Sequence, residues 1–217
     1  LIRPLPFKDP DRLVLPSYGL PRSMFFPRPG MVEAQYVEYA KRARLIESIS
    51  AVGEMQITLS GSGEATRLAG AGVTPSFFGV IGVRPVIGRG FVADDDQPGR
   101  DAVVISDGVW RERFGADASI IGRPITLDGE RRTIVGVMPP EFDFPFNAKV
   151  WVPIRIVVNP HESRLRPVLA RLAPNATPQQ ALAEMQAIVG RMENPFGPNG
   201  QLRPEVLPLR QFVVGDI

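Results

Sequence analysis

The sequence predicts an α+β protein in which an α/β subdomain is built from both ends of the chain and a β-rich segment is inserted into it. Helices with an apolar face are expected near each end, beside short extended runs. Between them, the abundant prolines and glycines (23 and 21 residues) divide the chain into many short β-branched runs. The predicted boundaries are 1–49 and 147–217 for the α/β subdomain and 50–146 for the insert.

The N-terminal end is predicted to contain a strand and then a helix. Residues 12–18 form an extended run after a proline-rich opening. Residues 33–46 are expected to be helical, because apolar side chains recur at spacings of three and four on one face: Val32, Tyr36, Tyr39, Ala43 and Ile46. Core or interface packing is a better interpretation of these tyrosines than a binding site.

The C-terminal end repeats this pattern with a strand over 164–172, a helix over 177–192 and a last strand over 201–207. The helix has the clearest signals in the chain. Thr177 and Gln180 have capping-box spacing, and Pro178 occupies the first helical position. Its apolar face is predicted to consist of Ala181, Leu182, Met185, Ile188, Val189 and Met192.

The middle segment contains a hairpin signal and two short helices. Asp128 and Gly129 lie between two β-branched runs, which is the pattern of a two-residue hairpin turn. One short helix is expected over 75–81. The other is expected over 107–114, with Ser106 as its N-cap.

Composition excludes several classes of function. The chain has no cysteine, so disulfides, thiolate zinc sites and cysteine nucleophiles are excluded. Its 25 basic and 23 acidic residues are interleaved, whereas a nucleic-acid-binding protein usually carries a basic stripe with aromatic residues. We therefore expect no nucleic acid among its partners.

Residues with catalytic or metal-binding chemistry are few. The one histidine, His161, lies in a loop-like stretch, and no G-x-S-x-G motif accompanies it. The acidic run Asp94–Asp96 lacks calcium-loop spacing, so a solvated loop is the better interpretation, and Arg100 is a further residue that can neutralise the run. The glycine-rich stretches match no phosphate-binding loop. We therefore predict no catalytic, cofactor-binding or metal-binding residue and expect a binding or mechanical module rather than an enzyme.

The sequence contains no run of about 20 apolar residues that could span a membrane. The most apolar stretch, 73–83, is short and includes Thr74, Pro75 and Ser76. No signal peptide is expected at Leu1, and the chain is expected to be a fragment or a processed protein.

Five segments in order resemble the extracytoplasmic domain of MacB-like ABC-transporter permeases. The opening LIRPLPFKDPDRLV is similar to the stretch that follows the first transmembrane helix in that family. GAGVTPSFFGVIGVRPVIGRGFVADDD resembles the segment whose small helix carries two aromatic residues, here Phe77 and Phe78. VVISDGVWRERFGADASIIGRPITLDGERRTIVGVMPPEFDFP resembles the family's most distinctive block. LARLAPNATPQQALAEMQAI and LRQFVVGDI resemble its closing helix and the approach to the second transmembrane helix.

The resemblance implies a βαβ-type porter-like subdomain formed from both chain ends and an inserted β-rich sabre-like subdomain. It implies that this fragment lies in the periplasm and that the full permease is an inner-membrane protein. The implied partners are a cytoplasmic ABC ATPase and a second permease copy; a periplasmic adaptor or outer-membrane protein is a further candidate partner. It also implies export of a lipoprotein or antibiotic by mechanotransmission, with Leu1 and Ile217 at the same end of the fold.

Two other functions remain open at this stage. One is a periplasmic module without a transport role that binds a ligand or peptide in a groove between the subdomains. The other is a hydrolase, which would require a cluster of reactive groups around His161.

Overall fold

The computed structural model describes residues 7–19, 30–61, 63–159, 164–190, 192 and 203–214. The chain divides into two compact units. Unit 1 comprises Leu1–Ala51, Gly79–Gly82 and Ile156–Ile217, and unit 2 comprises Val52–Phe78 and Val83–Arg155. The four residues 79–82 thus belong to unit 1, although the chain on both sides of them belongs to unit 2.

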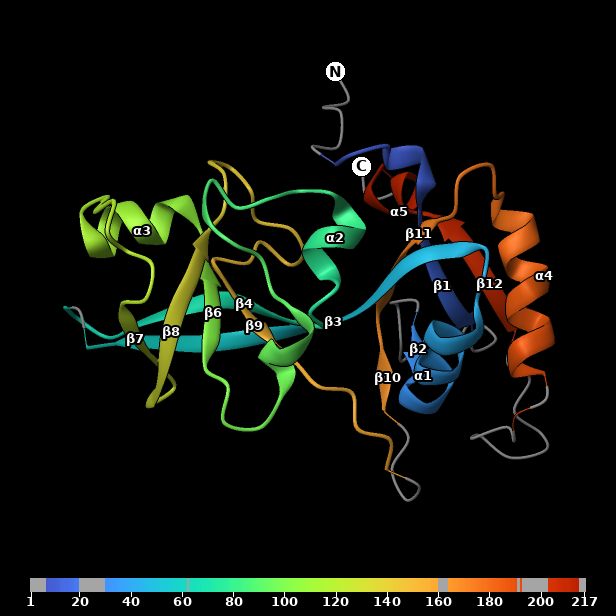
Figure 1. Ribbon diagram of the computed structural model, residues 1–217, viewed down its shortest axis with the longest axis horizontal. Coiled ribbons are helices and arrows are strands. Elements are labelled where there is room, and N and C mark those ends of the chain that lie inside the picture. Colours follow the sequence, from blue (N-terminus) through green and yellow to red (C-terminus); the bar gives the residue numbers. More distant parts are fainter. Residues whose placement is uncertain are drawn as a thin grey trace. The chain divides into compact units, whose positions relative to one another are not determined.

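Unit 1 contains an antiparallel ladder in the order β12–β1–β11–β3 (Figure 1). In sequence, α1 connects β1 to β3, and α4 connects β11 to β12. Each helix therefore joins two strands that run parallel with one antiparallel strand between them. This is the split βαβ arrangement of ferredoxin-like domains, and it confirms the mixed α/β class. The elements are β1 (Leu13–Gly19), α1 (Glu33–Arg42), β3 (Ile46–Ser60), β11 (Val168–Leu172), α4 (Pro178–Val189) and β12 (Arg203–Pro208).

Helix α4 begins as predicted. The Thr177 side chain accepts a hydrogen bond from the Gln180 N–H (3.2 Å), and the Gln180 side chain accepts one from the Thr177 N–H (2.9 Å). This capping box satisfies donors that have no partner within the helix. The buried side of the helix lies in the unit 1 core, which contains Tyr36, Tyr39, Ile49, Val168, Ala181, Met185, Val189 and Val206 among others.

Helix α1 ends at Arg42, four residues before the predicted end. Ala43 adopts an extended conformation (ψ 130°). In α4, Glu184 accepts hydrogen bonds from the N–H groups of Arg44 (2.8 Å) and Leu45 (3.1 Å). These tertiary hydrogen bonds compete with continuation of the helix and direct the chain into β3. The helical spacing of apolar residues does not reveal this competition.

The strand predicted over 164–172 is two strands. β10 (Leu165–Arg166) pairs with β2 (Met31–Val32), whereas β11 joins the main ladder of unit 1. Two further short elements of the unit are the 3-10 turn η1 (Pro10–Arg12) and α5 (Leu209–Val214). They contact each other, and Arg210 forms an ion pair with Asp11 at 3.0 Å. Leu1 and Ile217 lie outside the described residues.

Unit 2 is a closed β-structure. The second part of β3 pairs with β4, and the ladder then continues through β9, β6, β8 and β7 and returns to β3, with β5 paired to β8. Closure leaves each strand in the ring with two neighbours, which limits exposed edges. The strands are β4 (Thr66–Val73), β5 (Ile87–Gly88), β6 (Ala102–Ile105), β7 (Pro124–Leu127), β8 (Glu130–Val137) and β9 (Val150–Pro153).

The local predictions for the middle of the chain are confirmed. Asp128 (φ 50°) and Gly129 (φ 81°) form the two-residue turn between β7 and β8, as expected for a hairpin whose central residues both need positive φ. Helix α3 (Asp107–Phe114) is capped by Ser106, whose hydroxyl accepts a hydrogen bond from the Val109 N–H at 3.2 Å. The helix expected over 75–81 is α2 (Phe77–Ile81), which is two residues shorter. In the part of the chain that the structure describes, no helix combines the length and apolarity needed to cross a membrane.

Candidate functional site: a buried arginine junction

The segment that precedes β1 makes a tight turn. Asp9 has left-handed backbone angles (φ 43°, ψ 62°), which aspartate tolerates better than most residues with a side chain. Pro10 then opens η1, and the Arg12 N–H donates to the Asp9 carbonyl oxygen at 3.0 Å. We call residues 8–12 the leading segment.

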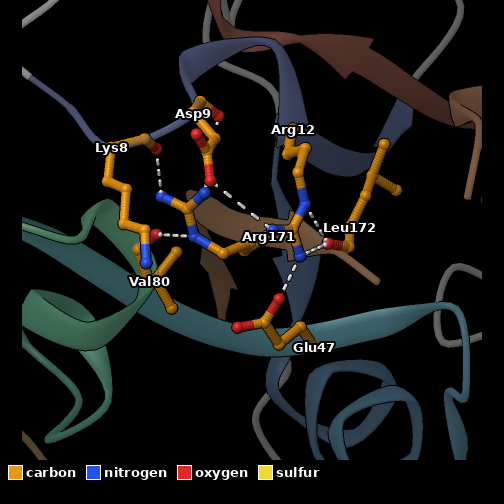
Figure 2. Close-up of polar contacts among 7 residues, drawn as sticks. All are labelled: Lys8, Asp9, Arg12, Glu47, Val80, Arg171 and Leu172. Atoms are coloured by element: carbon orange, nitrogen blue, oxygen red, sulfur yellow. Dashed lines mark hydrogen bonds and ion pairs between the residues drawn. The ribbon is translucent and has the colours of Figure 1, made fainter. Parts of the chain in front are cut away.

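Arg171 of β11 is the central residue of the site, and it is 3% exposed. Its guanidinium donates to three main-chain carbonyl oxygens (Figure 2). The Nε atom lies 2.8 Å from Val80 O, Nη2 lies 2.6 Å from Lys8 O, and Nη1 lies 3.4 Å from Asp9 O. One side chain thus joins the C-terminal part of α2, the leading segment and β11.

Arg12 and Glu47 form a second layer beside Arg171 (Figure 2). Arg12 donates to Leu172 O from Nε (3.0 Å) and from Nη2 (2.6 Å), and its guanidinium also pairs with the Glu47 carboxylate. Glu47 lies at the start of β3, so this layer fastens the leading segment to two strands of unit 1. The seven residues drawn in Figure 2 are called the arginine junction below: Lys8, Asp9, Arg12, Glu47, Val80, Arg171 and Leu172.

Gly82 lets the leading segment approach the end of α2 closely. Its φ is +70°, and a Cβ atom on Gly82 would lie 2.5 Å from Lys8 Cβ and 3.4 Å from Arg171 Nη2. The Lys8 N–H donates to Ile81 O at 3.2 Å in the same place. A side chain at position 82 would therefore be strained by its backbone angle and would also collide with the leading segment.

The junction contains a buried positive charge, that of the Arg171 guanidinium. Burial lowers the pKa of Arg171, and the neighbouring charge of Arg12 lowers it further, whereas Glu47 and Asp9 raise it. Arginine stays protonated in proteins even so. The carbonyl oxygens replace the lost hydration of the cation, so Arg171 holds main-chain segments together and does not act as an acid, a base or a nucleophile.

The other end of α2 packs among aromatic side chains of unit 2. Phe77 and Phe78 are both buried and meet edge to face at 5.2 Å. Phe77 stacks on Phe144 at 6.2 Å, and Phe78 contacts Phe91 and Trp151 at 5.5 and 6.3 Å between ring centroids. The two aromatic residues singled out in the sequence are thus core residues that fix the N-terminal turn of α2.

The acidic run Asp94–Asp96 lies in the 3-10 turn η2 (Ala93–Asp96) of unit 2. Only Asp95 of the three is buried, and Arg89 binds its carboxylate through two hydrogen bonds of 2.6 and 3.1 Å. The Val92 N–H also donates to Asp95, at 2.8 Å. Arg89 therefore neutralises Asp95 through direct contact, and the charge of Arg100 also favours the ionised carboxylate.

The ion pair between Asp95 and Arg89 is expected to make the free energy of unfolding depend on pH. Burial raises the pKa of Asp95, but hydrogen bonds from Arg89 and Val92 and the charges of Arg89 and Arg100 outweigh it, so the net pKa is lowered. A lowered folded-state pKa stabilises the fold above the unfolded value of about 3.9 and loses this effect as the pH falls through the folded value. The free-energy difference between wild type and Asp95→Asn should therefore be constant from about pH 5 to 7 and shrink below about pH 4.

Urea denaturation at a series of pH values measures this difference. Asp94→Asn is the matched control, because Asp94 is exposed in the same turn, and it should leave stability nearly unchanged. An Asp95→Asn difference that is as large at pH 3 as at pH 7 would contradict the assignment.

Other groups named from the sequence do not form a reactive site in the described residues. His161 lies outside them. Among the residues that the structure describes, no group of three or more His, Cys, Asp or Glu side chains is arranged to hold a metal ion.

The arginine junction was not predicted from the sequence, although one signal for it exists. Arg171 interrupts the apolar run from Val168 to Leu172, in which all five residues are buried. A charged residue within such a buried strand implies a specific set of partners. The partners themselves come from positions about 90 and 160 residues away along the chain, a distance over which no local pattern operates.

Comparison with known proteins gives one family and several similar folds. The family model described as MacB-like periplasmic core domain matches residues 6–188. A comparison with curated proteins gives no significant match.

Solved structures that are similar to the chain include the following three. The periplasmic region of MacB from Actinobacillus actinomycetemcomitans aligns with a TM-score of 0.66 at 12% identity, over 95% of this chain and 94% of that one. The extracellular domain of the noncanonic ABC-type transporter YknZ from Gram-positive bacteria aligns with a TM-score of 0.59 at 16% identity, over 82% and 95% of the two chains. A domain of a putative permease protein from Porphyromonas gingivalis has the same TM-score and identity, over 93% and 90%. At these identities the structural likeness establishes the fold.

Proposed function

The chain belongs to the family of MacB-like periplasmic core domains and is the periplasmic domain of an ABC-type transporter permease, and from this premise we propose that it transmits motion during export. The family is one of permease domains rather than enzymes. In this proposal ATP binding and hydrolysis by a cytoplasmic ABC ATPase move the membrane helices, and the domain carries that movement into the periplasm.

The observation that carries the proposal is the contact between the first and last described elements of unit 1. Because η1 contacts α5 and Asp11 pairs with Arg210, the first and last described elements of unit 1 lie beside each other. A loop between two transmembrane helices needs this arrangement, since both helices meet the same membrane face. The porter-like role is proposed for unit 1 (predicted as 1–49 and 147–217) and the sabre-like role for unit 2 (predicted as 50–146).

The proposed partners follow from the same premise. They are the ABC ATPase, a second permease copy in the membrane, and a periplasmic adaptor or outer-membrane protein. The proposed cargo is a lipoprotein or an antibiotic-like molecule. The buried arginine junction supports a mechanical role over a chemical one, because the Arg171 guanidinium donates to three main-chain oxygens.

Hydrogen exchange on the full permease with its ATPase tests the transmission of motion. In lipid nanodiscs, ATP is expected to change amide exchange in the leading segment and α2 relative to ADP, because a moving membrane helix alters the restraint on the segment next to it. The isolated 217-residue chain should show no response to ATP. Identical exchange with ATP and ADP in the full permease would contradict mechanotransmission through this domain.

A further inference from the structure

The arginine junction joins parts of the chain that have different attachments. The leading segment is the first described stretch of unit 1, and on the proposed function it follows a membrane helix. Helix α2 has its first two residues in unit 2 and its last three in unit 1. A displacement of the leading segment therefore reaches α2 only through whatever holds the two together.

Arg171 supplies most of that connection. The guanidinium is planar and rigid, so its three bonds fix the positions of Lys8 O, Asp9 O and Val80 O relative to one another. A lysine could not reproduce this fork, because its single nitrogen sits on a flexible stem. The bond from Lys8 N–H to Ile81 O and the close approach at Gly82 complete the contact between the leading segment and α2.

Both ends of α2 are thus fastened. Phe77 and Phe78 hold its first turn in the aromatic cluster of unit 2, and the junction holds its last carbonyl groups in unit 1. A helix of five residues is too short to be stable alone, so its position is set by these two attachments.

We propose that Arg171 is a positioning residue that couples the leading segment to α2, so that movement delivered to residues 8–12 is passed to α2 instead of being lost in the turn at Asp9. This inference rests on the proposed function for the source of the movement. The coupling itself is a property of the 217-residue chain and is tested on it first.

Hydrogen exchange of Arg171→Met in the isolated chain tests the clamp. Amides in residues 8–12 and 79–82 should exchange at least about tenfold faster than in wild type, because local opening of these segments no longer requires the hydrogen bonds from Arg171 to be broken. Arg166→Met is the matched control: it removes a half-buried arginine of unit 1 that pairs with buried Glu33 at 2.7 Å and is not part of the arginine junction. In that variant the exchange rates of the amides in 8–12 and 79–82 should change only as much as the exchange rates of the amides in α4 do.

A second variant keeps the test valid if Arg171→Met does not fold. Gly82→Ala leaves Arg171 in place but forces position 82 away from Lys8. It should accelerate exchange in the same two segments, whereas Gly99→Ala, also at a positive φ but with no atom within 4 Å of an added Cβ, should not. Unchanged exchange of residues 8–12 and 79–82 in both Arg171→Met and Gly82→Ala would overturn the clamp.

The coupling is then tested in the full permease with its ATPase. Arg171→Lys should retain ATP hydrolysis while the ATP-dependent change in α2 exchange is lost and that of the leading segment persists. A variant whose α2 still responds as wild type does would overturn the coupling and leave mechanotransmission intact. Wild-type permease without any ATP response would overturn both proposals.

Discussion

Replacing Met185 with aspartate is expected to unfold unit 1 or to destabilise it by about 3–5 kcal/mol at neutral pH. Met185 is fully buried on the inner side of α4, between Ala181 and Val189 on the same face. It belongs to the apolar cluster that also contains Tyr39. An ionised carboxylate there has neither water nor a cation to compensate for its burial, and the methionine's packing is lost as well.

Denaturation of Met185→Asp in urea measures the effect, and Gln186→Asp is its matched control. Gln186 is the next residue of α4 and is exposed, so the same substitution there should cost less than about 1 kcal/mol. The Met185→Asp defect should also decrease as the pH falls, because burial raises the pKa of the new carboxyl group and its neutral form is less costly. Equal loss in the two variants would mean that the buried face of α4 is assigned wrongly.

Local signals in the sequence predicted much of the fold. The capping box at Thr177, the serine cap before α3 and the Asp128–Gly129 turn each depend on residues within a few positions of one another, and all three are confirmed. The predictions that were wrong concern features set by contacts between residues far apart in the sequence. Helix α1 stops early because Glu184, 140 residues further along, binds the amide of Arg44.

The candidate site was beyond the reach of local patterns for the same reason. A proline-flanked aspartate predicts a turn, and an arginine within an apolar strand predicts a buried charge. Neither indicates that Arg171 and the turn at Asp9 meet, because that contact depends on β1 pairing with β11. The closure of unit 2 through β7 and β3 is likewise a property of register and pairing rather than of any single strand.

Unit 2 contains the second position at which a large effect is expected. Trp151→Ala should lower the free energy of unfolding by about 3–5 kcal/mol. Trp151 is fully buried in β9, its ring lies 5.4 Å from that of Phe142, and its Nε1–H donates to Phe144 O at 3.0 Å. Truncation removes the ring from the aromatic cluster, leaves a cavity and deprives a carbonyl oxygen of its donor.

Trp110 is the matched control, because it is the only other tryptophan of the chain. It is half-buried on α3, and its Nε1–H donates to Asp117 O at 2.9 Å. Trp110→Ala therefore loses a comparable hydrogen bond but less buried area, and it should cost about 1–2 kcal/mol. Each variant keeps one tryptophan, so urea unfolding can be followed by fluorescence as well as by circular dichroism.

Trp151→Phe separates the ring from its hydrogen bond. Phenylalanine keeps an aromatic ring in the cluster but cannot donate to Phe144 O, so we expect a loss of about 1–3 kcal/mol, between wild type and alanine. If phenylalanine is as damaging as alanine, the indole hydrogen bond rather than ring packing holds the cluster around Phe78. If alanine costs no more at position 151 than at position 110, the aromatic cluster does not stabilise unit 2, and α2 loses the attachment that the proposed coupling requires at its N-terminal end.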